Sequence, residues 1–329
     1  MDEIQNSSSV EAENTDARTC KKVTLTLVIP VFNESETVSL FMERVKKVFN
    51  VFDWISLDIV FVNDGSTDDT LVRLLKLKNQ YKSIRIVDLS RNFGKEAALT
   101  AGLNIASGNI VVPIDVDLQD PPELIIEMID RWRDGYDVVV GKRIDRESDS
   151  WPKRKSAAWF YRIHNKISEP KIPENVGDFR LMDRSVVEAL NELSESRRFM
   201  KGLFAWVGFR TTAVAYARPE RIAGTTKFNG WRLWNFALEG ITSFSTDPLR
   251  IWTYIGCAVA SISFLFAIFM VFKVLIYGAD VPGYASVFVA VTFLGGLQLV
   301  GIGIVGEYLG QSYIESKRRP VYLVRRIYG

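Results

Sequence analysis

The sequence contains almost none of the residues that build the common metal and covalent-catalysis sites. Of its 329 residues only His164 is a histidine, and only Cys20 and Cys257 are cysteines. The two cysteines lie far apart, one in a polar segment and the other in an apolar run. These absences exclude a disulfide framework, a zinc site with the usual ligand spacing and a histidine-based metal cluster. A Ser-His-Asp triad would have to use His164, for which we favour an ordinary surface or packing role.

A strong net charge and the usual phosphate-binding loop are also missing. No GxxxxGK[ST] stretch occurs, and no GxGxxG follows one of the strands predicted below, which argues against the common glycine-rich nucleotide sites. Lys and Arg number 41 against 39 Asp and Glu, a formal net charge of +2. This near balance argues against a general polyanion binder, and we expect no nucleic-acid partner.

Two long apolar runs near the carboxyl end are the clearest feature of the chain. Residues 251–272 and 281–306 contain no Asp, Glu, Lys or Arg, and each exceeds the roughly 18 to 20 residues needed to cross a hydrocarbon core. We therefore expect two transmembrane helices within 249–311, at about 250–276 and 283–308, rather than two buried helices of a soluble protein. The amino-terminal residues 1–21 have no apolar signal region and are predicted to be a disordered polar tail.

Basic residues around the two runs predict their orientation. Arg250 precedes the first run, the connecting loop contains only Lys273 and Asp280, and the basic tail at 312–329 contains Lys317, Arg318, Arg319, Arg325 and Arg326. Positive charge is enriched on the cytoplasmic side of membrane proteins. We therefore expect a multi-pass protein of the bacterial inner (cytoplasmic) membrane, with its catalytic domain and both termini in the cytoplasm.

The segment 22–225 alternates between two kinds of hydrophobic pattern. β-branched runs at 25–32, 57–64, 84–90, 109–117 and 136–143 are separated by stretches with helical spacing. Continuous apolar runs of this kind are typical of parallel strands buried on both faces. The alternation predicts an α/β domain with a doubly wound, mostly parallel sheet.

Polar residues follow these strands: Asn33, Glu34, Asp64, Asp88, Asp115 and Asp117. Doubly wound sheets bind ligands beyond the carboxyl ends of their strands, so we expect these residues to share one crevice. The stretch PIDVDLQDPPE adds Asp120 and Glu123 to the last pair. Carboxylates in such a crevice can accept hydrogen bonds from base and ribose groups or hold a hard divalent ion, for which Asp115 and Asp117 are the candidate pair. We interpret Asp120 and Glu123 as helix-start residues, because prolines at 121 and 122 favour a helix beginning there.

Several motifs together resemble one enzyme family. VIPVFNE, NDGSTDDT, LSRNFGKEAAL and DVDLQDPPE are similar, in this order, to the motifs of family 2 glycosyltransferases with the GT-A fold. NVGDFRLMDR, GTTKFNGWRLW and the apolar hairpin resemble the polyprenyl-phosphate glycosyltransferases, most closely the bactoprenol glucosyltransferases of phage-derived O-antigen modification clusters. The likeness covers about residues 22–328. It implies a GT-A domain followed by an interfacial amphipathic helix at 226–248 and the transmembrane hairpin.

The resemblance also implies a reaction and its ligands. Glucose would pass from UDP-glucose to undecaprenyl phosphate with inversion, for O-antigen or cell-envelope glucosylation, with Mg²⁺ or Mn²⁺ on Asp115 and Asp117. Further implied partners are membrane lipids, copies of the same chain in a homo-oligomer such as a tetramer, a flippase and a downstream glucosyltransferase. The implied donor-binding residues are Pro30, Phe32, Glu34, Asp64, Lys95, Asp115, Gln119 and Arg221. A turn-forming role remains the alternative for Asp64.

Three residues are candidates for the chemistry itself. We assign Asp117 to the metal, Lys227 to charge relief on the leaving diphosphate, and Asp178 to positioning of the sugar or acceptor. An ion pair with Arg180 is the alternative for Asp178. A lipid phosphate is already largely ionised near neutral pH, with a second pKa of about 6, so a strong general base is not required.

A segment rich in cations and aromatic rings is the candidate site for the lipid phosphate. Residues 141–162 contain Arg143, Lys153, Arg154 and Lys155 among Trp and Tyr side chains. A nucleic-acid surface has a similar composition, but the neighbouring apolar runs favour a membrane interface. Residues 226–248 are expected to form the amphipathic helix on that interface.

Other functions remain open at this stage. A relative that transfers mannose or aminoarabinose would have nearly the same motifs, and a non-catalytic nucleotide-sugar-binding membrane protein is a further alternative. A processive polysaccharide synthase is disfavoured, because QxxRW is absent and only two spans are expected. A transporter is disfavoured because the two spans contain no internal charge.

Overall fold

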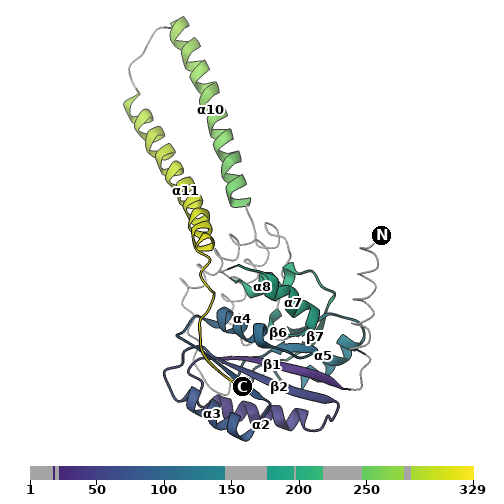
Figure 1. The fold of residues 1–329 in the computed structure, drawn as a ribbon. Helices are drawn as coiled ribbons and strands as arrows, with labels where there is room; N and C mark the ends of the chain where they lie inside the picture. The colour runs from purple at the N-terminus through teal and green to yellow at the C-terminus, as the bar shows by residue number, and fades with distance from the viewer. Residues whose placement is uncertain (1–17, 19–21, 145–175, 196–197, 218–246, 278–282) are drawn as a thin grey trace, which may run out of the picture.

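The computed structural model describes residues 18, 22–144, 176–195, 198–217, 247–277 and 283–329 (Figure 1). The strands are β1 (Val23–Val31), β2 (Ile55–Asn63), β3 (Ile84–Leu89), β4 (Ile110–Pro113), β5 (Val138–Arg143), β6 (Val176–Asp183), β7 (Thr211–Tyr216) and β8 (Val324–Tyr328). The helices are α2 (Thr37–Phe49), α3 (Thr70–Gln80), α4 (Lys95–Ile105), α5 (Leu124–Arg133), α7 (Arg184–Glu192), α8 (Met200–Trp206), α10 (Asp247–Tyr277) and α11 (Tyr284–Ser316).

The strands form one 8-stranded sheet in the order β7-β5-β6-β4-β1-β2-β3-β8. β1 pairs in parallel with β2 and β4, β2 with β3, and β5 with β7. β6 and β8 run antiparallel to their neighbours. The sheet is therefore mixed and mostly parallel, as predicted. Because β2 and β4 lie on opposite sides of β1, the strand order reverses there, which is where doubly wound sheets bind ligands.

Alternating side chains give the sheet two buried faces. Leu25, Leu27 and Ile29 of β1 pack with α2, α3 and α5, whereas Val28 and Val111 pack with α4, α7 and α8 on the other face. This is the period of two expected of a strand. Figure 1 shows α2 and α3 below the sheet and α4 and α8 above it, on the side from which α10 and α11 rise.

Helices α10 and α11 project from the α/β domain side by side (Figure 1). They contain 31 and 33 residues. Within them, the described residues include one segment long and apolar enough to cross a membrane, Phe293–Ser316, and 6% of its most apolar window is buried. The described residues thus support one of the two spans expected from the sequence.

Contact between the two helices depends on one glycine. A Cβ atom at Gly301 of α11 would lie 1.9 Å from the indole nitrogen of Trp252 on α10. A hydrogen at this position is what lets the large ring lie against the α11 backbone, as small residues do at other helix contacts.

The end of the chain returns to the sheet, where the sequence predicts only a basic tail. After α11, residues 317–323 lead down to β8, which pairs antiparallel with β3 (Figure 1). The amide of Ser90 donates to the carbonyl of Leu323 at 2.9 Å, and Asn104 on α4 donates to the hydroxyl of Tyr322 at 2.7 Å. The last residues therefore cover an edge of the α/β domain that would otherwise present unpaired backbone groups.

Candidate active site

A cavity of about 310 Å³ lies beyond the carboxyl ends of β1, β2 and β4. Most of the predicted donor-binding residues line it, together with both carboxylates assigned to the metal: Pro30, Phe32, Glu34, Asp64, Lys95, Asp115 and Asp117. The rest of the wall consists of Val31, Asn92, Gly94, Ala98 and Val116. The structure therefore brings together residues separated by up to 87 positions in the sequence, from Pro30 to Asp117.

The loops that border the cavity use unusual backbone conformations. Asn33, Gly65 and Leu118 have φ angles of 56°, 66° and 57°, in the left-handed region that residues other than glycine rarely adopt. A Cβ atom on Gly65 would lie 2.3 Å from the backbone carbon of Arg91, so only glycine fits there. Such backbone outliers cluster at functional sites because the turn sets the direction of the neighbouring side chains.

Asp64 is held by the loop that precedes α4. Its two carboxylate oxygens accept hydrogen bonds from the amides of Phe93 and Gly94, at 2.7 and 2.9 Å. Burial raises the pKa of Asp64 even though these amides favour its charged form. Asp64 therefore holds a loop 29 and 30 positions further along the chain, and it also lines the cavity.

Lys95 connects the two acidic parts of the site. Its ammonium nitrogen lies 2.8 Å from a carboxylate oxygen of Asp115, after β4, and 2.9 Å from Oδ2 of Asp178 on β6. Lys95 is the first residue of α4, and its side chain is 45% exposed. The ion pair with Arg180, considered above as the alternative role for Asp178, is thus made with Lys95, although Arg180 adds its positive charge nearby.

These contacts set the charges of the site. Burial opposes the charge on Asp178, but Lys95 and Lys201 outweigh it and lower the pKa of Asp178 to about 2. Burial likewise opposes the charge on Lys95, yet Asp178 and Asp115 raise the pKa of Lys95 above its usual value. The pair is thus ionised at neutral pH. Asp178 Oδ1 is buried and has no hydrogen-bond partner among the described residues.

Gln119 lies beside the metal candidates rather than in the cavity wall. Its backbone N–H donates to Asp117 Oδ1 at 3.1 Å. Its buried side-chain oxygen Oε1 has no hydrogen-bond partner among the described residues. Among those residues there is no group of three or more His, Cys, Asp or Glu side chains that could hold a metal ion. A Mg²⁺ ion usually takes only one or two carboxylates together with water and substrate phosphates. The oxygen donors of Asp115 and Asp117, the first already beside the cation of Lys95, fit such a nucleotide-bound ion.

Glu96 is an acidic residue of this region that the sequence analysis missed. Burial and the nearby Asp178 raise the pKa of Glu96 to about 8, against the attraction of Lys95 and Lys201. Glu96 Oε2 accepts from the amide of Met200, the first residue of α8, at 3.3 Å. No sequence motif marks this contact, because it joins segments more than 100 positions apart.

Arg180, also on β6, is nearly buried beside these acids. Its guanidinium donates to the carbonyl of Gly177 at 2.8 Å and lies 3.8 Å from the centre of the Phe204 ring. Burial lowers the pKa of Arg180 to about 10, against the attraction of Asp178 and Glu96. The guanidinium therefore stays charged at neutral pH and belongs to the same cluster.

Glu123 lies at the start of a helix, as predicted, whereas Asp120 has a different role. Helix α5 begins only at Leu124, with Glu123 as its N-cap residue but without a side-chain capping bond. Glu123 instead pairs with Arg44 at 2.5 Å. Asp120 is 3% exposed and accepts a hydrogen bond from the hydroxyl of Tyr216. Its carboxylate is needed to pair a buried phenol, which no local pattern in the sequence indicates.

Arg143 joins this buried pair instead of lying on an open surface. Its Nε donates to the Tyr216 hydroxyl at 3.4 Å, and its guanidinium lies 3.9 Å from Asp120. Burial opposes its charge, but Tyr216 and Asp120 raise the pKa of Arg143. Arg143 is 28% exposed, so its predicted contact with a lipid phosphate could use only part of the side chain.

Asp88 does not line the crevice with the other strand-end residues. It is 1% exposed and accepts from Asn63 Nδ2 at 2.7 Å, while Arg325 of β8 lies 3.4 Å away. The prediction that placed Asp88 in the ligand crevice is therefore wrong for this side chain. A partner from the distant C-terminal strand could not be read from the local sequence.

Several predicted residues lie outside the described part of the chain: Arg221, Lys227, Lys153, Arg154 and Lys155, and nearly all of the expected interfacial helix 226–248. Arg18, from the predicted polar tail, is described and pairs with Asp137 at 2.5 Å.

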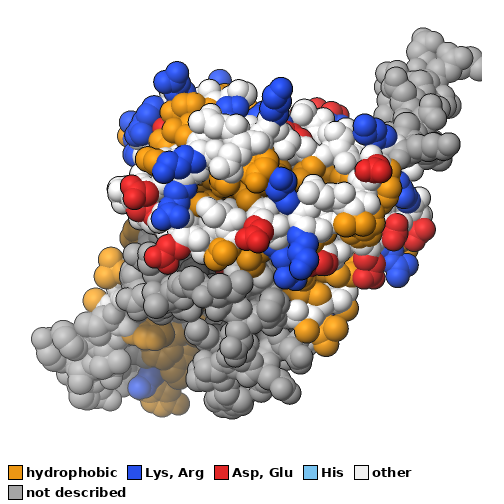
Figure 2. Space-filling view, turned by 90° about the horizontal axis from the view of Figure 1, so that it is seen from below, with side chains coloured by type: hydrophobic (Ala, Val, Ile, Leu, Met, Phe, Trp, Pro, Cys, Tyr) orange, Lys and Arg blue, Asp and Glu red, His pale blue; other side chains and the backbone are white. Residues whose placement is uncertain are grey.

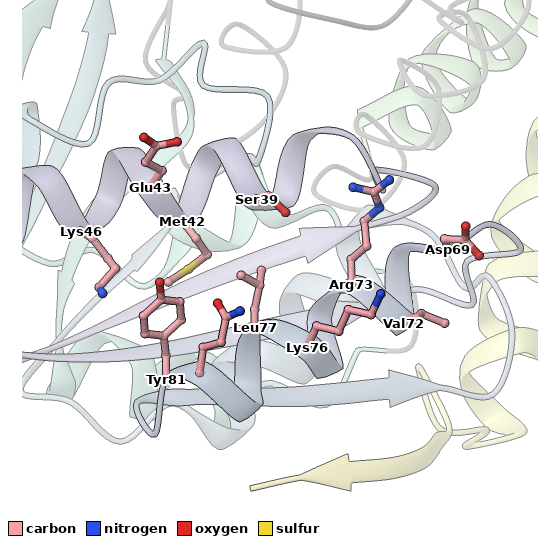
Figure 3. A pocket seen from close by; sticks show the side chains of 11 residues that line it. Ser39, Met42, Glu43, Lys46, Asp69, Val72, Arg73, Lys76, Leu77 and Tyr81 are labelled. Carbon is pink, nitrogen blue, oxygen red and sulfur yellow. The ribbon is translucent and has the colours of Figure 1, made fainter.

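A larger cavity, of about 810 Å³, lies between α2 and α3 (Figure 3). Long surface side chains of both signs border it, among them Glu43, Lys46, Asp69 and Lys76. Figure 2 shows this side of the molecule, where Lys and Arg alternate with Asp and Glu and neither sign gathers into one patch. Because no strand ends there and none of its lining residues is an unpartnered buried polar group, the smaller crevice is the better candidate for chemistry.

Comparison with known proteins supports the same region. The family model described as "Glycosyl transferase family 2" matches residues 26–190, which include the whole cavity wall. The chain is 53% identical over 303 residues to the "Prophage bactoprenol glucosyl transferase homolog" of Escherichia coli K12, covering 92% of this chain and 99% of that protein. It is 54% identical over 301 residues to the "Bactoprenol glucosyl transferase" of Shigella phage SfV, covering 92% and 98%.

Solved structures show a weaker likeness. Glucosyl-3-phosphoglycerate synthase from Mycobacterium tuberculosis, crystallised with Mn²⁺, UDP-glucose and phosphoglyceric acid, is 17% identical with a TM-score of 0.47, over 70% of this chain and 81% of that one. Such a score at this identity says nothing about the ligands of this chain.

Proposed function

Because the chain belongs to glycosyl transferase family 2, we propose that it transfers glucose from UDP-glucose to undecaprenyl phosphate and releases UDP. Relatives named as bactoprenol glucosyl transferases, 53% and 54% identical over nearly their whole length, support this choice of donor and acceptor. The anomeric carbon would form a bond to a phosphate oxygen of the lipid while its bond to the diphosphate breaks, which inverts its configuration.

The observation that carries the proposal is the bridge from Lys95 to Asp115 and Asp178. It places a carboxylate from β4, a carboxylate from β6 and one cation at the edge of a nucleotide-sized cavity. Glycosyl transfer needs positive charge near the leaving diphosphate and polar groups that orient the sugar. Lys95 can supply the first, and Asp178, with its unpartnered buried oxygen, can accept a hydrogen bond from a sugar hydroxyl.

A divalent ion, Mg²⁺ or Mn²⁺, would be held by Asp115 and Asp117 and would neutralise charge on the donor's diphosphate. Phe32 and Asp64, which line the same cavity, would contact the base. Gln119, Arg221 and Lys227 complete the proposed donor site, Lys227 as a second cation near the leaving group. Each of these assignments predicts weaker donor binding or slower turnover on substitution.

The long helices support membrane attachment. Side chains such as Phe266, Phe269, Ile302 and Leu309 are 61%, 60%, 66% and 69% exposed, and so much exposed apolar surface requires a nonpolar environment. We propose that α10 and α11 form a hairpin through the bacterial inner membrane, with the α/β domain and both termini in the cytoplasm. The lipid headgroups would then contact residues 226–248 and the basic side chains of Arg143, Lys153, Arg154 and Lys155.

Glucose attached to a lipid on the cytoplasmic side must cross the membrane before an external glycan such as O-antigen can receive it. We therefore expect a flippase and a second glucosyltransferase to act after this protein. A homo-oligomer, such as a tetramer held by the membrane helices, is also part of the proposal.

The decisive experiment incubates the purified full chain with undecaprenyl phosphate, Mg²⁺ and a panel of UDP- and GDP-sugars, and detects the lipid product by mass spectrometry. A hexosyl-phosphoryl lipid formed only from UDP-glucose is the expected result. Product from another donor would favour a mannose or aminoarabinose transferase. Binding of UDP without any product would favour a non-catalytic nucleotide-sugar-binding protein.

A pair of variants links the product to the proposed site. Asp117→Asn should abolish metal-dependent turnover, because the amide is a much weaker ligand for a hard cation. Asp134→Asn makes the same chemical change on an exposed residue whose contact is an ion pair with Arg131, and it should leave turnover unchanged. Equal activity in the two variants would contradict the assignment of Asp117.

A further inference from the structure

The C-terminal strand places a cation next to a buried carboxylate behind the candidate site. One guanidinium nitrogen of Arg325 lies 3.4 Å from Asp88 Oδ2, and the other donates to the carbonyl of Ser90 at 2.7 Å. Asp88 is 1% exposed, whereas the Arg325 side chain is 58% exposed. A buried carboxylate that loses its charged partner is strongly destabilised. Arg325 therefore reaches from the surface to compensate a charge inside the domain.

Asp88 is connected in turn to the cavity wall. Its Oδ1 accepts from Asn63 Nδ2 at 2.7 Å, and Asn63 Oδ1 accepts from the amide of Ser66 at 3.3 Å. The Asn63 side chain thus has a defined orientation, with its amide nitrogen toward Asp88 and its oxygen toward the turn that follows β2. That turn begins with Asp64, which lines the cavity.

The same turn also fixes the end of β1. Ser66 Oγ accepts from the amide of Asn33 at 3.0 Å, and Asn33 Oδ1 accepts from the amide of Thr67 at 2.8 Å. Asn33, in the left-handed conformation, lies between Phe32 and Glu34, two further residues of the cavity wall. A continuous series of polar contacts therefore runs from β8 to both loops on the nucleotide side of the cavity.

We infer that Arg325 is a positioning residue for the nucleoside diphosphate: through Asp88 and Asn63 it sets the conformation of the two loops, at 32–34 and 64–67, that border the donor crevice. This inference rests on the proposed function for the identity of the donor. Lys95 and Asp178 contact neither of these loops in the described hydrogen bonds and ion pairs. Loss of Arg325 should therefore weaken donor binding and leave the rate of the bound complex nearly unchanged.

The matched pair for the test is Arg325→Gln and Arg326→Gln in the full chain. Both remove one positive charge from the same strand. Arg326 faces Asp88 in the backbone register of β3 and β8, but its guanidinium lies over the ring of Tyr328, 5.1 Å from its centre, and it is Arg325 that makes the ion pair with Asp88. We expect Arg325→Gln to raise the KM for UDP-glucose about tenfold, within the range of such indirect couplings, with kcat within about twofold. The KM of Arg326→Gln should equal that of the parent. Arg325→Lys keeps the charge but cannot contact Asp88 and the Ser90 carbonyl at the same time through two guanidinium nitrogens, so its KM should lie between those of the parent and Arg325→Gln.

A double-mutant cycle tests whether Arg325 acts on the two loops through Asp88. Asp88→Asn keeps an oxygen for Asn63 but removes the charge that pairs with Arg325. Adding Arg325→Gln to Asp88→Asn should then raise the KM no further, because the coupled contact is already lost. Fully additive changes in KM would mean that Arg325 acts by another path and would overturn the inference.

Hydrogen exchange of the chain without donor separates this inference from the proposed function. Arg325→Gln should speed exchange of the amides of Asn33, Ser66 and Thr67 relative to Arg326→Gln. If exchange is equal in the two variants, the inference is wrong whatever the protein binds. If exchange rises as expected while the parent chain binds no UDP, the positioning role stands and the proposed donor is wrong.

Discussion

At the scale of single residues, the acidic side chains of the site are joined by one central cation, Lys95, with Lys201 and Arg180 nearby. Asp115 and Asp178 approach from different strands, and Lys95 lies within 2.9 Å of both. Without it the two carboxylates would share a partly buried region with Glu96, whose pKa is already raised by burial and by Asp178. The charge state of the site therefore depends on Lys95 more than on any other described residue.

Replacing Lys95 by Met should test this dependence. The substitution keeps most of the side-chain volume but leaves Asp178 without its main attractive partner, so the pKa of Asp178 should rise and diphosphate charge should be less well stabilised. We expect the transfer rate to fall by roughly 10²-fold or more, as for other electrostatic groups at reacting centres. Initial rates of UDP release measure it. Lys95→Arg, the charged control, should retain clearly more activity than Lys95→Met, and similar rates for both would contradict a charge-based role.

Glu96 gives a prediction for the pH dependence of stability. Its pKa is raised from 4.5 to about 8 in the folded chain, so the folded state keeps a proton that the unfolded state loses. The stabilising contribution is complete below pH 4.5 and is lost as the pH rises through about 8. Glu96→Gln has no proton to lose. The free energy of unfolding of the parent, measured with urea and compared with this variant, should therefore decrease across that window, and a constant difference would contradict the burial of Glu96.

The prediction that polar residues at the strand ends share one crevice was confirmed for several of them. Glu34, Asp64 and Asp115 line one cavity because parallel strands end at the same edge. The predictions differed from the structure where a distant element supplies the partner: Asp120 binds Tyr216 and Asp88 binds Arg325. A carboxylate in a motif shows that charge is needed, but its partner depends on topology.

At the scale of elements, the strands with a regular hydrophobic pattern could be predicted from the sequence. The apolar runs of β1 and β2 indicate buried parallel strands because both faces of each are covered. Strand β8 is different: its residues are VRRIY, and all but the last are exposed. It forms because the edge of β3 offers unpaired backbone groups, and such pairing depends little on side-chain pattern.

The contact between α10 and α11 can be tested at Gly301. Gly301→Ala would place a methyl group 1.9 Å from the ring of Trp252, so the indole or the helix must move. We expect a destabilisation of about 1 to 3 kcal/mol, typical of overpacking, seen as a lower thermal unfolding midpoint of the full chain in detergent. Gly303→Ala, on the same helix with open space around its Cβ position, is the control and should unfold like the parent. Equal midpoints would show that the two helices do not pack in this way.

At the scale of the whole molecule, α10 and α11 are connected to the α/β domain at both ends. The chain enters α10 at Asp247, after the α/β domain, and after α11 it returns through residues 317–323 to the edge of the sheet (Figure 1). A domain joined at one point can rotate about that linker, whereas two points fix its orientation. If the helices span a membrane, β8 would therefore help to keep the crevice at a constant direction relative to the lipid surface.

Removal of the last seven residues, 323–329, should reveal what this second connection contributes. The shortened chain keeps both long helices and every residue of the cavity wall, but β3 loses its antiparallel partner and Asp88 loses Arg325. We expect faster hydrogen exchange along β3 and a lower unfolding midpoint, because an edge strand with a buried unpaired carboxylate is less stable. Replacing the same seven residues by a Gly-Ser stretch of equal length controls for chain length and should give the same loss. If both chains exchange and unfold like the parent, β8 adds nothing to the stability of the sheet, and the orientation of the α/β domain relative to the long helices would have to depend on the entry into α10 alone.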